Sequence, residues 1–379
     1  MCRIEKVEVI IFESPKMDER WNKAPVEKPY SIFPEHDKIL KIVREWGVFV
    51  VKVTCDDGTY GYGQTGTYNV CADLVNRFFG PMLVGQNPLE IERLWDMMFK
   101  ASIPFGRRGA ALMAISAIDI ALWEIFGKIA KLPVYQLLGG KVREKIRCYG
   151  TGPQAELHKE KNYMGSKIPM PYGPEHGAEG IRKNAERVQQ VRELMGPDAD
   201  IMCDCWCGWD YNYTIKMAER LQEYRIKWIE EPLVPDDIEG YRRLRPLLNG
   251  MNIMLATGEH EHSRWGAREL IDNECVDILQ PDIEYCGGVS EMKKIMAYAS
   301  AKGVTVIPHC PCVAGMHVVM NSTVSPYMER LTSGYRPLFL TDYTEKDGWL
   351  ELSDSPGYGI ELNPDFPVRE RQGSCERGL

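Results

Sequence analysis

The chain has 379 residues, and 44% of them are hydrophobic, which is enough for one large domain with a smaller one beside it. It carries 46 basic and 54 acidic residues, and the formal net charge of −8 argues against nucleic acid or an anionic membrane surface as a partner. The N-terminus lacks the pattern of a signal peptide. Charged residues interrupt the most apolar stretch, residues 109–130, so we expect a buried helix in a cytoplasmic protein.

The first 130 residues predict an α+β unit. The N-terminal segment MCRIEKVEVIIF is typical of a strand, and residues 49–63 alternate apolar and polar side chains around an Asp-Gly turn. Between residues 84 and 130, apolar residues recur every three or four positions, as on one face of a helix. This part of the chain is therefore expected to combine a hairpin with helices.

From Lys145 onward, short β-rich runs alternate with amphipathic helices at intervals of roughly 25 residues. The strand candidates are KIRCYGTG, GSKIP, ADIMCD, IKWIEE, NIMLATGE, VDILQPD and GVTVIPH, with an eighth near Glu329. Such repeats predict a parallel sheet covered by helices, either an open doubly wound sheet or a closed barrel. The number of strands favours the barrel, and no glycine motif for nucleotide binding accompanies it.

The twelve cysteines are too sparse in a chain of this length to indicate a disulfide scaffold, so we expect most of them to be reduced thiols. Cys203, Cys205 and Cys207 alternate with other residues, and in a continuous strand all three would point to one face. Cys310 and Cys312 repeat this spacing. Structural cysteines are the main interpretation, and a soft-metal site is the alternative.

Acidic or titratable residues stand where the predicted barrel strands end. They are Asp204, Glu230 with Glu231, Glu259, Asp282 and His309. Each of them alone is also compatible with a helix cap or a turn. The C-terminal strand ends of a (β/α)-barrel converge on one mouth, however, so five successive strands with such endings predict a shared site.

Asp204, Glu230 and Glu259 predict a magnesium site at three adjacent strand ends. Crowded carboxylates repel one another unless a cation compensates them, and a hard divalent ion prefers oxygen ligands. When a proton is removed from the carbon next to a carboxylate, a second negative charge develops on the substrate. A bound dication stabilises that charge, so the site suits proton abstraction beside a carboxylate.

His309 is the candidate base, because histidine titrates near neutral pH and can both take and return a proton. Asp282, one strand earlier, can hydrogen-bond the far imidazole nitrogen and set its tautomer. The alternative is that His309 is paired in the barrel mouth for structure alone.

With these residues in place, the chain resembles the mandelate racemase branch of the enolase superfamily over nearly its whole length. The motifs that carry the resemblance are ISAIDIALWEIFGKIAKLPVYQLLGG, KIPMPYGPEHGAEGIRKN, DCW, KWIEEPLVPDDIEGY, GEHEHSRWG, ILQPDIEYCGG and the dipeptide PH at 308–309. The resemblance implies an α/β fold, a (β/α)7β-type modified TIM barrel over residues 131–340. It also implies an α+β capping domain over residues 1–130, which the C-terminal segment 341–379 returns to complete.

The resemblance also implies roles for individual residues. These are Asp204, Glu230 and Glu259 as Mg²⁺ ligands, His309 as base, Asp282 as its partner and Glu329 on the eighth strand beside the substrate. On the capping domain, Arg44 is expected to contact the substrate. In the barrel, His260 directly follows Glu259 and is also expected to contact the substrate, with an N-cap or packing role as the alternative. The family's capping-domain histidine has no counterpart in residues 21–25, and His36 lies too late to align.

The second barrel strand discriminates between reactions. Racemases of this branch carry Lys-x-Lys there, whereas this chain keeps Lys167 but has Pro169 at the second position. Proline cannot take a proton, so His309 is left as the only evident base, and elimination is expected rather than racemisation. Lys167 then becomes a supporting charge or a structural residue.

These observations predict an acid-sugar dehydratase. The enzyme would take the C2 proton of an aldonate such as L-rhamnonate and eliminate the 3-hydroxyl, which gives a 2-keto-3-deoxy acid. An epimerase, racemase or cycloisomerase on the same fold is one alternative, and a non-catalytic binding or regulatory relative is another. The complete set of strand-end residues argues against the latter. The resemblance further implies a homo-oligomer, often an octamer.

Overall fold

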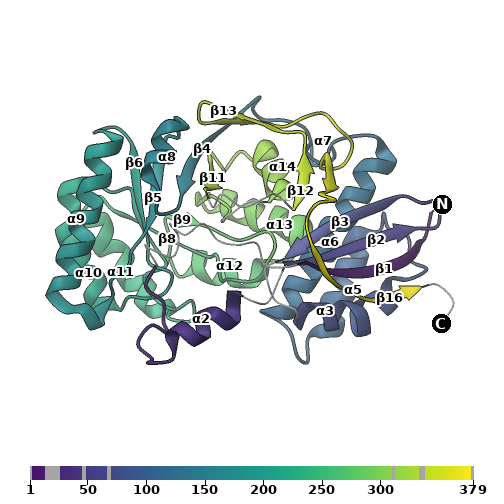
Figure 1. The fold of residues 1–379 in the computed structure, drawn as a ribbon, viewed down its shortest axis with the longest axis horizontal. Helices are drawn as coiled ribbons and strands as arrows, with labels where there is room; N and C mark the ends of the chain where they lie inside the picture. Colours follow the sequence, from purple (N-terminus) through teal and green to yellow (C-terminus); the bar gives the residue numbers. More distant parts are fainter. Residues whose placement is uncertain are drawn as a thin grey trace.

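A computed structural model describes residues 2–12, 26–44, 48–65, 70–309, 312–332 and 338–376. Figure 1 shows two bodies side by side: a four-stranded sheet with its helices at the end where both termini lie, and a larger ring of strands surrounded by helices. The C-terminal strand, in yellow, runs beside the first strands, in purple, although they are hundreds of residues apart in sequence.

The smaller body is an antiparallel sheet with the strand order β16-β1-β2-β3. Its strands are β1 (Ile4–Phe12), β2 (Val48–Cys55), β3 (Tyr60–Thr65) and β16 (Val368–Glu376). The helices of this part of the chain are α2 (His36–Arg44), α3 (Val70–Leu74), the π-helical turn η1 (Val75–Phe79), α4 (Gly80–Leu83), α5 (Ile91–Ser102) and α6 (Ala110–Ala130). The predicted N-terminal strand and hairpin are confirmed.

Helix α6 packs unusually close to β3. A β-carbon at Gly63 would lie 1.8 Å from the carbonyl oxygen of Ala117, and one at Gly61 would lie 2.1 Å from that of Ala121, so only glycine fits at these two positions. By length and composition α6 could cross a membrane, but 83% of its most apolar window is buried inside the protein. It is therefore the core helix that the sequence predicted.

The larger body contains eight parallel strands within the described residues. They are β4 (Ile146–Thr151), β5 (Gly165–Pro169), β6 (Asp200–Asp204), β7 (Trp228–Glu230), β8 (Met254–Thr257), β9 (Ile278–Leu279), β10 (Thr305–Val306) and β11 (Met328–Leu331). Neighbours pair in sequence order, and β11 pairs with β4. The amide of Val306 donates to the carbonyl of Val324 just before β11, which brings the last two strands together.

Each of the first seven barrel strands is followed by a helix. These helices are α8 (Ala155–Glu160), α9 (Gly177–Met195), α10 (Tyr211–Leu221), α11 (Ile238–Gly250), α12 (Ser263–Asp272), α13 (Gly288–Ala301) and α14 (Val313–Asn321), with η2 (Pro174–His176) before α9 and η3 (Gln222–Tyr224) after α10. A short helix, α7 (Val134–Leu137), joins α6 to the barrel. This is the expected (β/α)7β arrangement, and the fold class is confirmed.

One layer of apolar side chains lies in the barrel interior. Its buried members are Tyr149 of β4 and, from β6 to β10 or their ends, Met202, Trp228, Ala256, Ile278 and Ile307. Side chains along a strand alternate between its two faces, so the residue two positions later points to the same side, nearer the C-terminal end. The apolar layer therefore sets the direction of the polar residues above it.

The C-terminal segment pairs first with the barrel and then with the capping sheet. Strands β13 (Thr344–Lys346) and β14 (Trp349–Glu351) form a hairpin that pairs with β4 of the barrel, while β12 (Phe339–Thr341) pairs with β15 (Ile360–Leu362). The chain then reaches the capping sheet as β16, paired with β1. Domain boundaries at residues 130 and 340 stay a prediction.

Candidate active site

The predicted magnesium ligands stand at adjacent strand ends. Asp204 is the last residue of β6 and Glu230 the last of β7, and the two are directly paired in the strand register. Glu259 comes after β8 and lies three positions after the interior residue Ala256, whereas Asp204 and Glu230 lie two positions after theirs. Gly258, with φ of +122°, bends the chain between Ala256 and Glu259, and this positive φ favours glycine.

Lys167 lies beneath these acids and is fully buried. Its ammonium donates to Oε1 of Glu230 and lies 2.8 Å from Oε1 of Glu329, which also accepts from the hydroxyl of Thr151. Burial opposes ionisation, but the charge of Lys167 outweighs it and lowers the pKa of Glu329 to about 2. Glu329, which the family resemblance placed beside the substrate, thus forms a buried ion pair with Lys167.

One lysine cannot neutralise all of the acids. Burial raises the pKa of Asp204 to about 6, with Lys167 opposing the rise and Glu259 adding to it. Burial likewise raises the pKa of Glu230 to about 7, again against Lys167 and with Asp204. The raised pKa values of Asp204, Glu230 and Glu259 show that negative charge at these oxygens is unfavourable without a further cation. This donor set fits Mg²⁺.

The three carboxylates do not form a tight cluster. Their oxygens are not all within 4.8 Å of one another, whereas the potential ligand atoms of two other groups among the described residues are. Glu230 accounts for part of this spacing, because its Oε1 accepts from Lys167 and its Oε2 accepts from Trp228 Nε1 at 3.0 Å and Gln280 Nε2 at 2.8 Å. Repulsion between the three negative carboxylates also keeps them apart.

His309 lies between two of the predicted site residues. Its Nδ1 is 2.8 Å from Oδ2 of Asp282, and its Nε2 is 3.3 Å from Oε1 of Glu259. The backbones of Asp282 and His309 form a parallel β-bridge, which aligns the two side chains. The structure thus brings the proposed base, its carboxylate partner and a proposed metal ligand together, and leaves Nε2 as the nitrogen that faces the mouth.

His260 faces the strand-end acid Glu231, to which the sequence assigned no separate role. Its Nδ1 lies 2.7 Å from Oε2 of Glu231, the second acid of the IEEP motif. Burial opposes protonation, yet Glu231 and Glu259 raise the pKa of His260 to about 9. Its ring also meets Trp206 edge-on with centroids 5.1 Å apart, and Lys28 stacks over Trp206 with its ammonium 3.3 Å from the ring centroid.

Two further residues were missed by the sequence reasoning. Gln280 holds Glu230 through its side-chain amide, and Glu284 accepts a hydrogen bond from Gln64 of β3 at 2.5 Å, which links the barrel mouth to the capping sheet. The alternation of side chains would have found Gln280, because it lies two residues after the interior residue Ile278. Arg44 ends α2, and its side chain lies outside the described residues.

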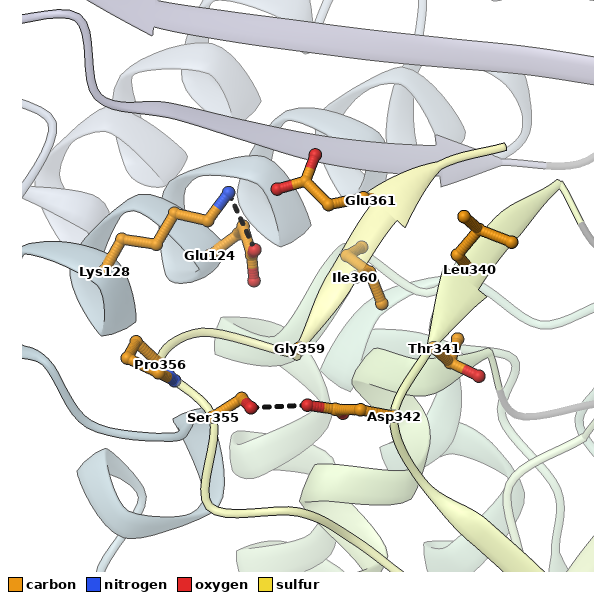
Figure 2. Close-up of a pocket in the computed structure, with 10 residues that line it drawn as sticks. All are labelled: Glu124, Lys128, Leu340, Thr341, Asp342, Ser355, Pro356, Gly359, Ile360 and Glu361. Carbon is orange, nitrogen blue, oxygen red and sulfur yellow. Dashed lines mark hydrogen bonds and ion pairs between the residues drawn. The ribbon is translucent and has the colours of Figure 1, made fainter. Parts of the chain in front are cut away.

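A separate pocket of about 460 Å³ lies between α6 and the strands β12 and β15. Figure 2 shows that its polar side chains face one another: Lys128 pairs with Glu124, and Ser355 donates to Asp342. None of the strand-end residues lines it. The pocket has volume but few free polar groups, so the strand ends are the better candidate for chemistry.

Comparison with known families agrees with this arrangement. The family described as "Enolase C-terminal domain-like" matches residues 155–366, and "Mandelate racemase / muconate lactonizing enzyme, N-terminal domain" matches residues 33–139. The chain belongs to the mandelate racemase branch of the enolase superfamily. The resemblance inferred from the sequence motifs is thereby confirmed.

This enolase-superfamily chain is 38% identical to an L-rhamnonate dehydratase of Saccharopolyspora erythraea over 363 residues, 93% of each chain. It is also similar to the L-rhamnonate dehydratase of Gibberella zeae, with a TM-score of 0.89, 32% identity, and 96% and 94% of the two chains covered. A rhamnonate dehydratase from Gibberella zeae complexed with Mg matches as well, with a TM-score of 0.88 and 30% identity, over 96% and 94% of the two chains. A 3,6-anhydro-D-galactonate cycloisomerase from Zobellia galactanivorans matches with a TM-score of 0.81 and 30% identity, over 96% and 97% of the chains.

Proposed function

We propose that this chain is a Mg²⁺-dependent acid-sugar dehydratase, a hydro-lyase that converts an aldonate into a 2-keto-3-deoxy acid and water. The observation that carries the proposal is the position of His309, held by Asp282 through Nδ1 while Nε2 faces Glu259. An imidazole held in this way can take a proton from a substrate in the mouth. The similarity to L-rhamnonate dehydratases supports the same reaction.

In the proposed reaction, Nε2 of His309 takes the proton from C2 of the aldonate, and the same nitrogen then gives it to the departing 3-hydroxyl. The C2–H and C3–O bonds break, a C2–C3 double bond forms, and water leaves. The resulting enol becomes the 2-keto acid. Asp282 accepts a hydrogen bond from Nδ1 and so stabilises the protonated imidazole between the two steps. Pro169, at the end of β5, offers no second base.

Asp204, Glu230 and Glu259 would hold the metal ion. When bound, Mg²⁺ supplies positive charge that stabilises the substrate carboxylate as it becomes dinegative. Lys167 is held in ion pairs with Glu329 and Glu230, so we propose that it supports the site by its charge and takes no proton from the substrate.

For the substrate, we propose L-rhamnonate or a stereochemical relative such as L-mannonate or L-lyxonate. Arg44 and His260 are proposed as contacts to the acid sugar. His260 suits this role because its side chain is 28% exposed and its Nε2 lies 3.9 Å from Oε1 of the proposed metal ligand Glu259.

The direct test is a screen of purified protein with Mg²⁺ against a panel of aldonates, with 2-keto-3-deoxy acids measured by semicarbazide absorbance. Turnover of at least one 6-deoxy or related aldonate is expected. If no acid sugar is dehydrated with metal present, the proposal fails.

A cycloisomerase is the second candidate, because the 3,6-anhydro-D-galactonate cycloisomerase is similar over almost the whole chain. The same screen distinguishes the two reactions. A cycloisomerase would isomerise an anhydro sugar acid without release of water, and its product would have the mass of the substrate.

The homo-oligomeric state and the cytoplasmic location stay predictions. Size-exclusion chromatography with light scattering tests the first of them.

A further inference from the structure

Three potential metal ligands gather beside the proposed magnesium site without belonging to it. Sγ of Cys207, a carboxylate oxygen of Glu231 and a ring nitrogen of His260 all lie within 4.8 Å of one another. Cys207 Sγ donates to Glu231 Oε2 across 3.5 Å, and His260 Nδ1 lies 2.7 Å from the same oxygen. The three residues follow three successive barrel strands.

The backbone after β6 explains why Cys207 reaches this group. The sequence predicted that Cys203, Cys205 and Cys207 share one face of a strand, and this prediction was wrong. Cys203 and Cys205 are buried in the apolar core, whereas the chain leaves the strand after Asp204. Trp206 and Cys207 take positive φ values of +42° and +60°, which turn the Cys207 thiol towards β7 and β8.

The group is held rigidly. The amide of Cys207 donates to the carbonyl of Glu231 at 2.7 Å, and the amide of Glu231 donates to that of Ala256 at 3.0 Å. The amide of His260 reaches Oε1 of Glu231 at 3.4 Å. Glu231 also has a positive φ, +44°, and such a conformation persists in a non-glycine residue only where the surrounding contacts maintain it.

The chemistry of this group differs from that of the magnesium site. A thiolate and an imidazole prefer zinc and similar borderline metals, whereas magnesium prefers oxygen. In a tetrahedral zinc site with bonds of about 2.0–2.3 Å, ligand atoms are roughly 3–4 Å apart, which small side-chain shifts reach from the present positions. Cys207 and Glu231 are buried, and the partly exposed His260 provides an entry path from the mouth.

We propose that Cys207, Glu231 and His260 form a zinc site with an open fourth position, next to but distinct from the magnesium site. Zinc would take the place of the thiol proton that now points at Glu231, and that proton would go to solvent. The inference uses His260, which is proposed above as a substrate contact, but it does not depend on the reaction or on the identity of the substrate.

Cobalt(II) tests this site, because a cobalt–thiolate bond gives a charge-transfer band in the near ultraviolet and cobalt bound to oxygen ligands does not. The full chain, saturated with Mg²⁺, is titrated with Co²⁺. We expect the band to rise to one equivalent, to be lost in Cys207→Ser and to be displaced by Zn²⁺. Cys275→Ser, which removes a buried thiol from another part of the fold, should keep the band. No band in the wild type, or an equal band in Cys207→Ser, would overturn the proposal.

A second measurement needs no variant. X-ray absorption of the wild-type protein loaded with one equivalent of Zn²⁺ should show one sulfur scatterer at about 2.3 Å together with nitrogen and oxygen. A first shell of oxygen and nitrogen alone would place the zinc at the acidic ligands and overturn the proposal.

Discussion

The ammonium of Lys167 lies 2.8 Å from the carboxylate of Glu329, and neither side chain is exposed. The same ammonium donates to Glu230, so a single positive charge serves two buried acids. The sequence left open whether Lys167 is a supporting charge or a structural residue. This geometry favours the supporting charge.

Replacement of Lys167 by Met should strongly destabilise the protein. It leaves Glu230 and Glu329 buried without a counter-charge, and breaking a buried ion pair from one side costs about 3–5 kcal/mol. Urea denaturation at pH 7 with fixed Mg²⁺ measures the change in the free energy of unfolding. The double variant Lys167→Met/Glu329→Gln should recover part of the loss, because it removes one of the stranded charges. Equal stability of wild type and single variant would refute the supporting role.

His309→Asn should abolish dehydration while the magnesium site remains. Asn is similar in size but cannot take the C2 proton, and loss of a general base lowers kcat by about 10²–10⁴-fold. Isothermal titration should show that Mg²⁺ affinity changes little, since His309 is not one of the oxygen ligands. Retained turnover in this variant would exclude His309 as the base.

Reaction in D₂O should leave the C2 configuration of unreacted substrate unchanged. Pro169 occupies the position on β5 where a second base would stand, so deuterium can return only from the face of His309. Proton NMR and chiral analysis of recovered aldonate measure the exchange and the configuration. Appearance of the C2 epimer would instead favour an epimerase.

Mg²⁺ should raise the thermal midpoint, and EDTA should lower it. A ligand that binds only the folded state at 100 times its Kd adds about 2.7 kcal/mol to stability. In Asp204→Asn the shift should largely disappear, and the metal-free variant should be at least as stable as the metal-free wild type, because one repelling charge is gone. A full Mg²⁺-dependent shift in the variant would show that Asp204 is not a ligand.

His317, remote from the strand ends, should make the protein sensitive to mild acid. Burial lowers its pKa from 6.5 to about 3, and its Nδ1 accepts from the amide of Tyr135. Between pH 6.5 and 5 the unfolded chain therefore takes up a proton that the folded chain does not, and the free energy of unfolding falls by about 2 kcal/mol as the pH decreases.

The variant His317→Asn keeps an acceptor for the Tyr135 amide but does not titrate. Its stability loss between pH 6.5 and 5, measured by urea denaturation, should be about 2 kcal/mol smaller than that of the wild type. Parallel losses in the two proteins would contradict this origin of acid sensitivity.

The amino-acid sequence alone determined the barrel and the positions of the strand-end residues. Strand and helix periodicities are local, and a strand end can be read from where an apolar run stops, so Asp204, Glu230, Asp282 and His309 could be named and assigned to one mouth. The presence of Pro169 in place of the second lysine of the racemase motif could also be read from the sequence, because it concerns a single residue in a recognisable motif.

Only the tertiary structure decided which of these groups contact one another. The ion pair of Lys167 with Glu329 joins β5 to β11, 162 residues apart, and the group of Cys207, Glu231 and His260 depends on positive φ values that no periodicity predicts. Side-chain pairing across a barrel follows from strand register and local bends, which are set by packing of the whole chain. For that reason the sequence indicated the magnesium ligands, whereas their counter-charge and the neighbouring thiol required the folded structure.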